Sequence, residues 1–186
     1  MVDGSVADLR VHTRRFDALR APDGVFFCTG NHEYYSGADE WVEEVARYGW
    51  IPLLNEHRLI ERDGARLLVA GCTDFNADRH GEEHASDPAK AREGAPDHDL
   101  SLLLAHQPKS IHAAAAAGYD LQLSGHTHGG QFFPANMFVG FAHPFHEGLG
   151  KQDDTWIYVN RGTGYWGPPN RAGVPAEITL IRLVRA

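Results

Sequence analysis

Short apolar runs separated by amphipathic stretches form the pattern of this chain. Strands are predicted at residues 25–29, 100–105, 121–124 and 155–160. Apolar positions three or four residues apart indicate amphipathic helices between the runs. Helices are predicted at residues 6–19, from Ser36 or Asp39 to Tyr48, and at residues 110–117. Strands that alternate with helices are typical of an α/β layered fold.

The remaining segments add a hairpin, a polar loop and a last strand. Residues 59–61 and 66–70 flank a turn that contains Asp-Gly, so a β-hairpin is predicted. Residues 76–98 are polar and are interpreted as a surface loop with a short helix, whose charges are solvated. A separator rich in Gly and Pro, residues 161–171, precedes a strand predicted at residues 177–183.

Composition limits the classes of partner. The chain has 186 residues, of which 42% are hydrophobic, and a formal charge of −8, so one domain over residues 1–186 is expected, with no nucleic-acid partner. Cys28 and Cys72 lie in apolar runs and are interpreted as buried, reduced thiols. No apolar segment is long enough to span a membrane, and the amino terminus does not resemble a signal peptide. The expectation is a cytoplasmic protein, with peripheral membrane association left open.

Metal-binding residue types follow three predicted strands. Asn31 and His32 stand in Gly-Asn-His-Glu, His106 follows residues 100–105, and His126 and His128 stand in Gly-His-Thr-His-Gly-Gly. Neutral imidazoles and amide oxygens are ligands for divalent cations. One histidine at a strand end is more often a surface or hydrogen-bonded residue. Three such loops together predict a metal site that supports hydrolysis.

These motifs, in this order, resemble the calcineurin-like metallophosphoesterase family, in particular its bacterial phosphodiesterase-like branch. The resemblance extends over nearly the entire chain and implies divalent cations, Mn, Zn or Fe, two in the complete site. It implies these ligands: Asn31, His106 and His126 for one ion and His128 for the second. It also implies that His32 contacts the phosphate and assists the leaving group. Arg171 is a candidate for substrate binding, with a structural turn role as the alternative.

The resemblance also implies the fold, and there the sequence departs from the family. A sandwich of two mixed β-sheets flanked by helices is expected, but the Asp-x-His and Gly-Asp-x-x-Asp motifs of the first strands are not in the sequence. Residues 1–4 resemble only the end of the second motif. The first strands of one sheet are therefore expected to be missing, leaving an edge that a second copy or a complementing chain covers. Because the remaining ligands are neutral, one ion or none is expected per chain, with Asp3 or Asp74 as a candidate carboxylate.

Three functions remain open from the sequence. The first is a metal-dependent phosphoesterase or phosphodiesterase that acts on a small phosphoester or a lipid-like substrate, with activity that is weak or dependent on assembly. The second is a non-catalytic metal-binding or interaction module, and the third is a metal-dependent carboxylic esterase. The phenylalanines and methionine at residues 132–145 are expected to pack in the core, with a contact to a lipid-like substrate as the alternative.

Overall fold

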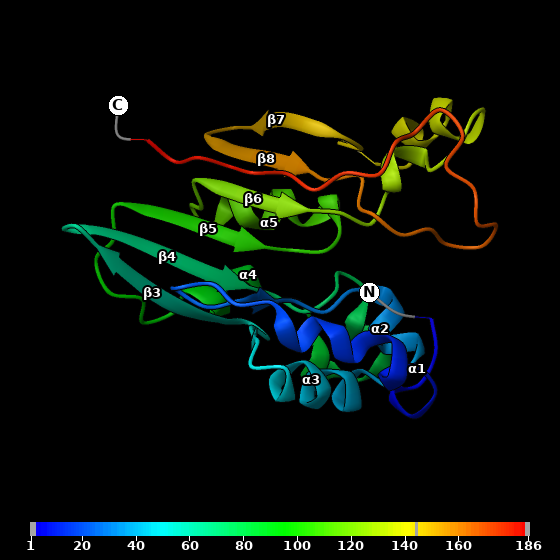
Figure 1. Ribbon diagram of the computed structural model, residues 1–186. Helices are drawn as coiled ribbons and strands as arrows, with labels where there is room; N and C mark the ends of the chain where they lie inside the picture. The colour runs from blue at the N-terminus through cyan, green and yellow to red at the C-terminus, as the bar shows by residue number, and fades with distance from the viewer. Residues whose placement is uncertain (1–2, 144, 185–186) are drawn as a thin grey trace.

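A mixed six-stranded sheet is the centre of the computed structural model, which describes residues 3–143 and 145–184 (Figure 1). The strand order is β3-β4-β5-β6-β8-β7. Strands β4, β5, β6 and β8 are parallel, and β3 and β7 pair antiparallel at the two edges. The strands are β3 (Glu56–Arg62), β4 (Ala65–Gly71), β5 (Leu100–Leu104), β6 (Leu121–Ser124), β7 (Gly148–Gln152) and β8 (Thr155–Val159).

Two short helices cover one face of this sheet. Helix α4 (Pro88–Arg92) packs on β3 and β4, and α5 (Ile111–Ala116) packs on β7 and β8. Their small residues, such as Ala91 and Ala114, pack against Leu103 in a core cluster that excludes water. Single 3₁₀ turns connect the elements: η2 (Ala77–His80), η3 (Glu82–His84), η4 (Pro108–Ser110), η5 (His128–Gly130), η6 (Ala135–Met137) and η7 (Val139–Phe141).

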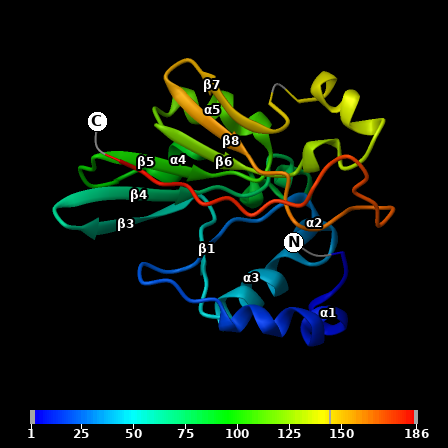
Figure 2. The same cartoon turned by 45° about the horizontal axis from the view of Figure 1, so that its top comes forward.

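The other face carries the amino-terminal part of the chain (Figure 2). Strands β1 (Phe26–Phe27) and β2 (Ile51–Pro52) form a two-stranded parallel sheet, and their side chains pack on the apolar residues of β4, β5 and β6. The helices on this side are α1 (Val6–Thr13), η1 (Arg14–Ala18), α2 (Asn31–Tyr35) and α3 (Ala38–Arg47). Helix α1 is fastened to α3 by an ion pair between Arg10 and the buried Glu44, at 2.7 Å.

Most predicted elements are confirmed, with shorter bounds for several. The hairpin is β3 and β4, joined by Asp63 and Gly64 with positive φ values of 52° and 74°, as its Asp-Gly turn predicts. The strands predicted at residues 25–29, 100–105, 121–124 and 155–160 are present as β1, β5, β6 and β8. The helix predicted over residues 6–19 changes to a 3₁₀ turn at Arg14.

Two expectations about the sheets are wrong, and one strand was missed. Two mixed sheets were expected, whereas the second sheet of the described residues has two parallel strands. The strand predicted at residues 177–183 does not pair: in the described chain it runs along the sheet as an extended segment, with Ile178 90% and Leu180 95% exposed (Figure 1). A strand needs the backbone of a neighbour, and apolar alternation alone does not supply one. Strand β7 was not predicted, because its sequence, Gly-Leu-Gly-Lys-Gln, lacks regular alternation.

Two further expectations concern thiols and membranes. Both cysteines are free, with Cys72 buried and Cys28 only partly so. Burial raises the pKa of the Cys72 thiol to about 11, so the thiol stays protonated at neutral pH. Among the helices of the described residues, none combines the length and the hydropathy that crossing a bilayer requires.

Candidate functional site

The candidate ligands all follow the carboxyl ends of parallel strands. Asn31 opens α2 just after β1, His106 follows β5, and His126 and His128 follow β6. The Gly125 N–H donates to the His106 carbonyl oxygen at 3.0 Å, which holds the loops after β5 and β6 side by side. Ligand sites of open α/β sheets form at this end of the strands, because the connecting loops leave a crevice there.

Three of the predicted ligands converge. Asn31 Oδ1 lies 3.0 Å from His106 Nε2 and 3.2 Å from His126 Nδ1, and the two imidazole nitrogens are 3.2 Å apart. We call these three residues the Asn-His-His trio. Since only two of the three atoms can carry a proton, no arrangement of hydrogen bonds satisfies all three sides of this triangle.

The spacing of the trio fits the face of a coordination polyhedron. With ligand bonds of about 2.1 Å, neighbouring donors lie about 3.0 Å apart around an octahedral cation and about 3.4 Å apart around a tetrahedral one. The observed sides of 3.0 to 3.2 Å fall within that interval. In the described part of the chain no three His, Cys, Asp or Glu side chains form a metal-type group, so the Asn31 oxygen is needed for the fit.

Burial keeps the two imidazoles of the trio neutral. It lowers the pKa of His106 well below the usual value, and the neighbouring His126 lowers it further. Burial, with a contribution from the nearby His143, lowers the pKa of His126 to about 4. A histidine must be neutral to offer a lone pair, so both rings are in the form that binds a cation at neutral pH.

Contacts at the Gly30 backbone fix the positions of Asn31 and His106 in the trio. The Gly30 N–H donates to Glu33 Oε2 at 2.7 Å, which closes the first turn of α2 and orients Asn31. The His106 ring lies directly against Gly30, since a β-carbon added there would meet the ring at 2.7 Å. Glycine is therefore required sterically at this position, and only its missing side chain lets the ring approach.

Of the two candidate carboxylates, Asp3 lies at the site and Asp74 lies behind it. Asp74 is buried and accepts both hydrogen bonds of the Gln107 amide group, at 3.0 and 3.1 Å, so it supports the loop of His106. The Asp3 carboxylate contacts His32 Nδ1, and both residues line a cavity of about 620 Å³ together with His106 and His128. Asp3 and His32 therefore form a pair beside the trio.

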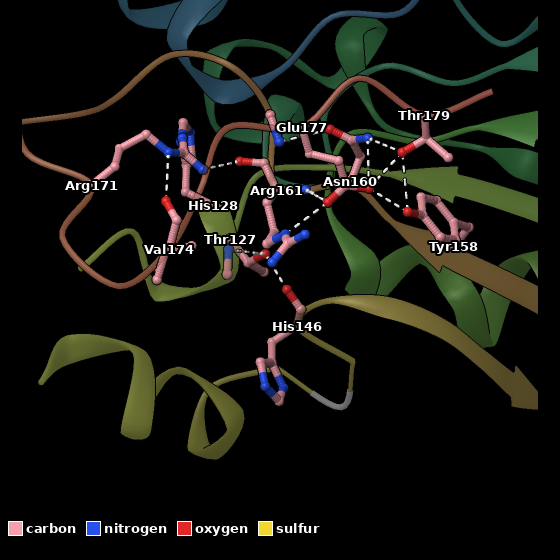
Figure 3. Close-up of polar contacts among 12 residues, drawn as sticks. Thr127, His128, His146, Tyr158, Asn160, Arg161, Arg171, Val174, Glu177 and Thr179 are labelled. Atoms are coloured by element: carbon pink, nitrogen blue, oxygen red, sulfur yellow. Dashed lines mark hydrogen bonds and ion pairs between the residues drawn. The ribbon is translucent and has the colours of Figure 1, made fainter. Parts of the chain in front are cut away.

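His128 does not join the trio but faces Arg171 (Figure 3). Arg171 Nη1 lies 3.3 Å from His128 Nδ1, and the same guanidinium donates to the carbonyl oxygens of Arg161, Val174 and Gly164. Burial, and then this guanidinium, lower the pKa of His128. A hydrogen bond from the ring to the Gly164 carbonyl oxygen acts in the opposite direction and raises that pKa. The predicted substrate role of Arg171 remains a prediction, while its contacts are those of a residue that orders the loop and orients His128.

The carboxylate of Glu177 fastens the carboxyl-terminal segment to this loop (Figure 3). It accepts hydrogen bonds from Arg161 Nε at 2.8 Å and Asn160 Nδ2 at 3.1 Å, and it contacts the hydroxyl groups of Tyr158 and Thr179. Burial acts to raise the pKa of Glu177, but these donors outweigh it and lower the pKa to about 2. The resulting fixed loop carries Arg171.

One site residue was missed in the sequence. The ring of His143 lies 5.3 Å from that of His126 in an edge contact, and its Nδ1 is buried with no hydrogen-bond partner among the described residues. Both rings, with Asn31 and His32, line a second cavity of about 560 Å³. His143 follows no strand, so position along the chain gave no signal for it.

Comparisons with known proteins agree on one family. A family model described as calcineurin-like phosphoesterase matches residues 1–130. The chain is 39% identical over 198 residues to a transmembrane protein with a metallophosphoesterase domain from Bos taurus, covering 100% of this chain and 44% of the relative. An uncharacterised metallophosphoesterase from Campylobacter jejuni is 33% identical over 187 residues, covering 98% of this chain and 48% of the relative. The chain thus spans less than half the length of these two relatives.

A solved structure supports the fold alone. The sulfate thiohydrolase SoxB from Thermus thermophilus, in complex with glycerol, superposes with a TM-score of 0.50 at 18% identity. The match covers 73% of this chain and 27% of that chain.

Proposed function

The chain belongs to the calcineurin-like phosphoesterase family, and from this we propose that it hydrolyses a phosphoester with the help of a divalent cation. The family is one of metal-dependent phosphoesterases. The observation that carries the proposal for this chain is the Asn-His-His trio, whose three donor atoms lie 3.0 to 3.2 Å apart and cannot all be satisfied by hydrogen bonds.

Asn31, His106 and His126 are the residues that would hold the cation. Bound there, it would polarise a phosphoryl oxygen and acidify water, which is the chemistry that divalent ions supply to phosphoester hydrolysis. The chain's own contribution is to keep both imidazoles neutral by burial and to fix their orientation through Gly30 and Gln107. Such support of metal ligands commonly changes affinity by about 10- to 100-fold.

We assign the proton for the leaving group to His32. Its Nδ1 contacts the Asp3 carboxylate, which orients the ring, so Nε2 is the nitrogen free to donate a proton. His128 lines the same cavity and would contact a phosphate oxygen there. Since the His128 ring is held between Arg171 and the Gly164 carbonyl oxygen, apart from the trio, we propose one cation per chain.

A metal count tests this assignment. We expect about one Mn²⁺ or Zn²⁺ per chain by elemental analysis after dialysis, retained in His128→Ala and lost in His126→Ala. Two ions per chain, with one lost in His128→Ala, would instead give His128 the ligand role of the complete family site.

Turnover tests the function itself. We expect metal-dependent cleavage of bis-p-nitrophenyl phosphate, reduced at least about 100-fold in His126→Ala because the polarising ion is lost. His112 is exposed on α5 and lines neither cavity of the site, so His112→Ala is the matched control and should keep its activity. Activity unchanged by chelation or by His126→Ala would refute the proposal.

One observation favours a second function. The trio contains no carboxylate, which is the reason a dinuclear centre was doubtful from the sequence. A non-catalytic metal-binding module is therefore the alternative, and it predicts bound metal with no turnover of phosphodiesters or phosphomonoesters. Cleavage of p-nitrophenyl acetate, in place of phosphoesters, would point to a metal-dependent carboxylic esterase.

A further inference from the structure

An exposed apolar segment lies next to the site. The segment that contains the turns η6 and η7 follows the His128 loop and exposes four large apolar side chains: Phe133 65%, Met137 65%, Phe138 61% and Phe141 88%. Only Phe145 of this stretch packs against a core cluster, that of α5 and β8. The expectation that these aromatic residues fill the core is therefore wrong for most of them. In Figures 1 and 2 the segment, in yellow, projects beyond the strands at the end where α2 lies.

The segment is fastened to the domain at its base. Gly130 lies so close to the Asn136 backbone that an added β-carbon would meet Asn136 Cα at 2.2 Å. The Phe133 N–H donates to the Ala172 carbonyl oxygen at 2.9 Å. The buried Gln131 bridges to the backbone of Trp166, accepting from its N–H at 2.7 Å and donating to its carbonyl at 2.8 Å. These contacts hold the apolar side chains outward in a fixed arrangement.

The exposed segment itself carries no formal charge. Residues 121–146 and residues 162–170 contain no Asp, Glu, Lys or Arg, in a chain of which 23% is charged and whose net charge is −8. Lys109 lies near enough to lower the pKa of His143. A single lysine gives a partner that binds through ion pairs little to pair with, and an acidic chain gains nothing from an anionic surface. The complementary partner is apolar and uncharged.

The exposed surface leads directly to the proposed reaction site. Phe138, Val139 and Trp166 line the same cavity of about 560 Å³ as Asn31 and His126. Around it, amphipathic aromatic side chains are also exposed: Tyr35 69%, Tyr165 57% and Trp166 48%. Rings with an apolar body and a polar edge favour the level of the lipid headgroups, whereas phenylalanine and methionine favour the acyl boundary below it.

We propose that this aromatic surface, Phe133, Met137, Phe138 and Phe141 with Tyr35 and Trp166, docks the domain onto the surface of a lipid bilayer. Apolar insertion and not charge provides the binding, so a zwitterionic bilayer suffices. The docked domain places the cavity of the Asn-His-His trio at the depth of the phosphate headgroups. This delivery of a headgroup rests on the proposed function, while the binding to lipid does not.

Flotation with unilamellar vesicles of phosphatidylcholine tests the proposal on the chain in its native form. We expect binding that persists when NaCl is raised from ~0.1 to ~0.5 M, because no ion pairs are screened. Phe138→Ser/Phe141→Ser should lower the partition coefficient by at least about tenfold, since each ring loses its insertion into the apolar layer. The matched control is Val11→Ser/Leu19→Ser, which removes apolar side chains that are 57% and 49% exposed near α1 and should leave binding unchanged.

Several outcomes would overturn the proposal. They are an absence of flotation, flotation lost in salt or seen only with phosphatidylglycerol, and an equal loss in both double variants. Sedimentation velocity adds another: a dimer that Phe138→Ser/Phe141→Ser dissociates, without vesicle binding by the wild type, would make a second copy the partner. Hydrolysis of bis-p-nitrophenyl phosphate, measured on the same samples, separates these outcomes from a failure of the proposed function, because that substrate is soluble.

Discussion

The contact between Gly30 and the His106 ring allows a sharp test of the trio. In Gly30→Ala the new β-carbon would lie 2.7 to 2.9 Å from three atoms of the ring. Carbon atoms pack at about 3.5 to 4.0 Å, so the ring must retreat by roughly 1 Å. The backbone itself is not strained by the change, since Gly30 has φ −112° and ψ 179°, an extended conformation open to alanine. The whole effect therefore acts through His106.

Such a displacement is large for a metal ligand. His106 Nε2 lies 3.0 Å from Asn31 Oδ1 and 3.2 Å from His126 Nδ1, so both distances change when the ring moves. Distances between a metal ion and its ligands tolerate a change of only about 0.2 Å. We expect the dissociation constant for Mn²⁺ or Zn²⁺ to rise by about 10- to 100-fold, with phosphoesterase activity at a fixed metal concentration falling in parallel. Overpacking should cost about 1 to 3 kcal/mol of unfolding free energy.

Isothermal titration with each metal, together with thermal unfolding, measures both effects. Gly164→Ala is the matched control, because a β-carbon there meets nothing within 4 Å and its φ is not positive. Should Gly30→Ala lose stability yet bind metal as the wild type does, His106 would not be a ligand and the trio would be a packing arrangement.

Three further predictions follow from the same contacts. Asp3→Asn should lower kcat about 10- to 100-fold with bound metal unchanged, because the carboxylate no longer orients the His32 ring; equal kcat would contradict this. The Glu177 pKa of about 2 lies below its usual 4.5, so its stabilisation of about 3 kcal/mol is present above pH 4.5 and is lost as pH falls towards 2. Urea unfolding at pH 7 and pH 3 should show this loss in the wild type and a smaller one in Glu177→Gln. The exposed Ile178 and Leu180 predict self-association that Ile178→Ser/Leu180→Ser abolishes, and a wild-type monomer in sedimentation velocity would refute it.

The strands of the sheet were predictable where their burial produces an apolar run in the sequence. Strands β5 and β6 lie inside the parallel sheet and are covered on both faces, so they appear as apolar runs. Strand β8 buries Ile157 and Val159 on one face, while Trp156 on the other is 46% exposed, and its apolar and aromatic residues also form a run. Residues 177–183 have the same type of run without a paired neighbour, and β7 is paired without such a run. Pairing is a property of two segments, which a pattern along one segment does not contain.

The trio was predictable for a topological reason. Parallel strands bring their carboxyl ends to one edge of a sheet, so His106 and His126, which follow the neighbouring β5 and β6, had to approach each other. Asn31 follows β1 of the small sheet, and its approach depends on how the two sheets pack. The separation of His128 from the trio was not predictable, because it depends on Arg171, 43 positions later, and on the positive φ of 52° at His128 itself. The exposure of Phe138 and Phe141 was not predictable either, because a stretch of aromatic residues has the same sequence pattern whether it packs in a core or forms a docking surface.

The low charge around the site links its two proposed properties. Because the trio offers two neutral imidazoles and an amide oxygen, a bound cation would keep nearly its full charge and would attract a phosphate anion strongly. A carboxylate on the surrounding turns would weaken that attraction, and any charge there would oppose insertion into an apolar layer. Residues 121–146, which hold both His126 and the exposed phenylalanines, satisfy both demands by having no charged residue. An uncharged segment beside a neutral ligand set is thus suited to a phosphoester met at a surface with little water, where the substrate's own phosphate supplies the negative charge that the ligands lack.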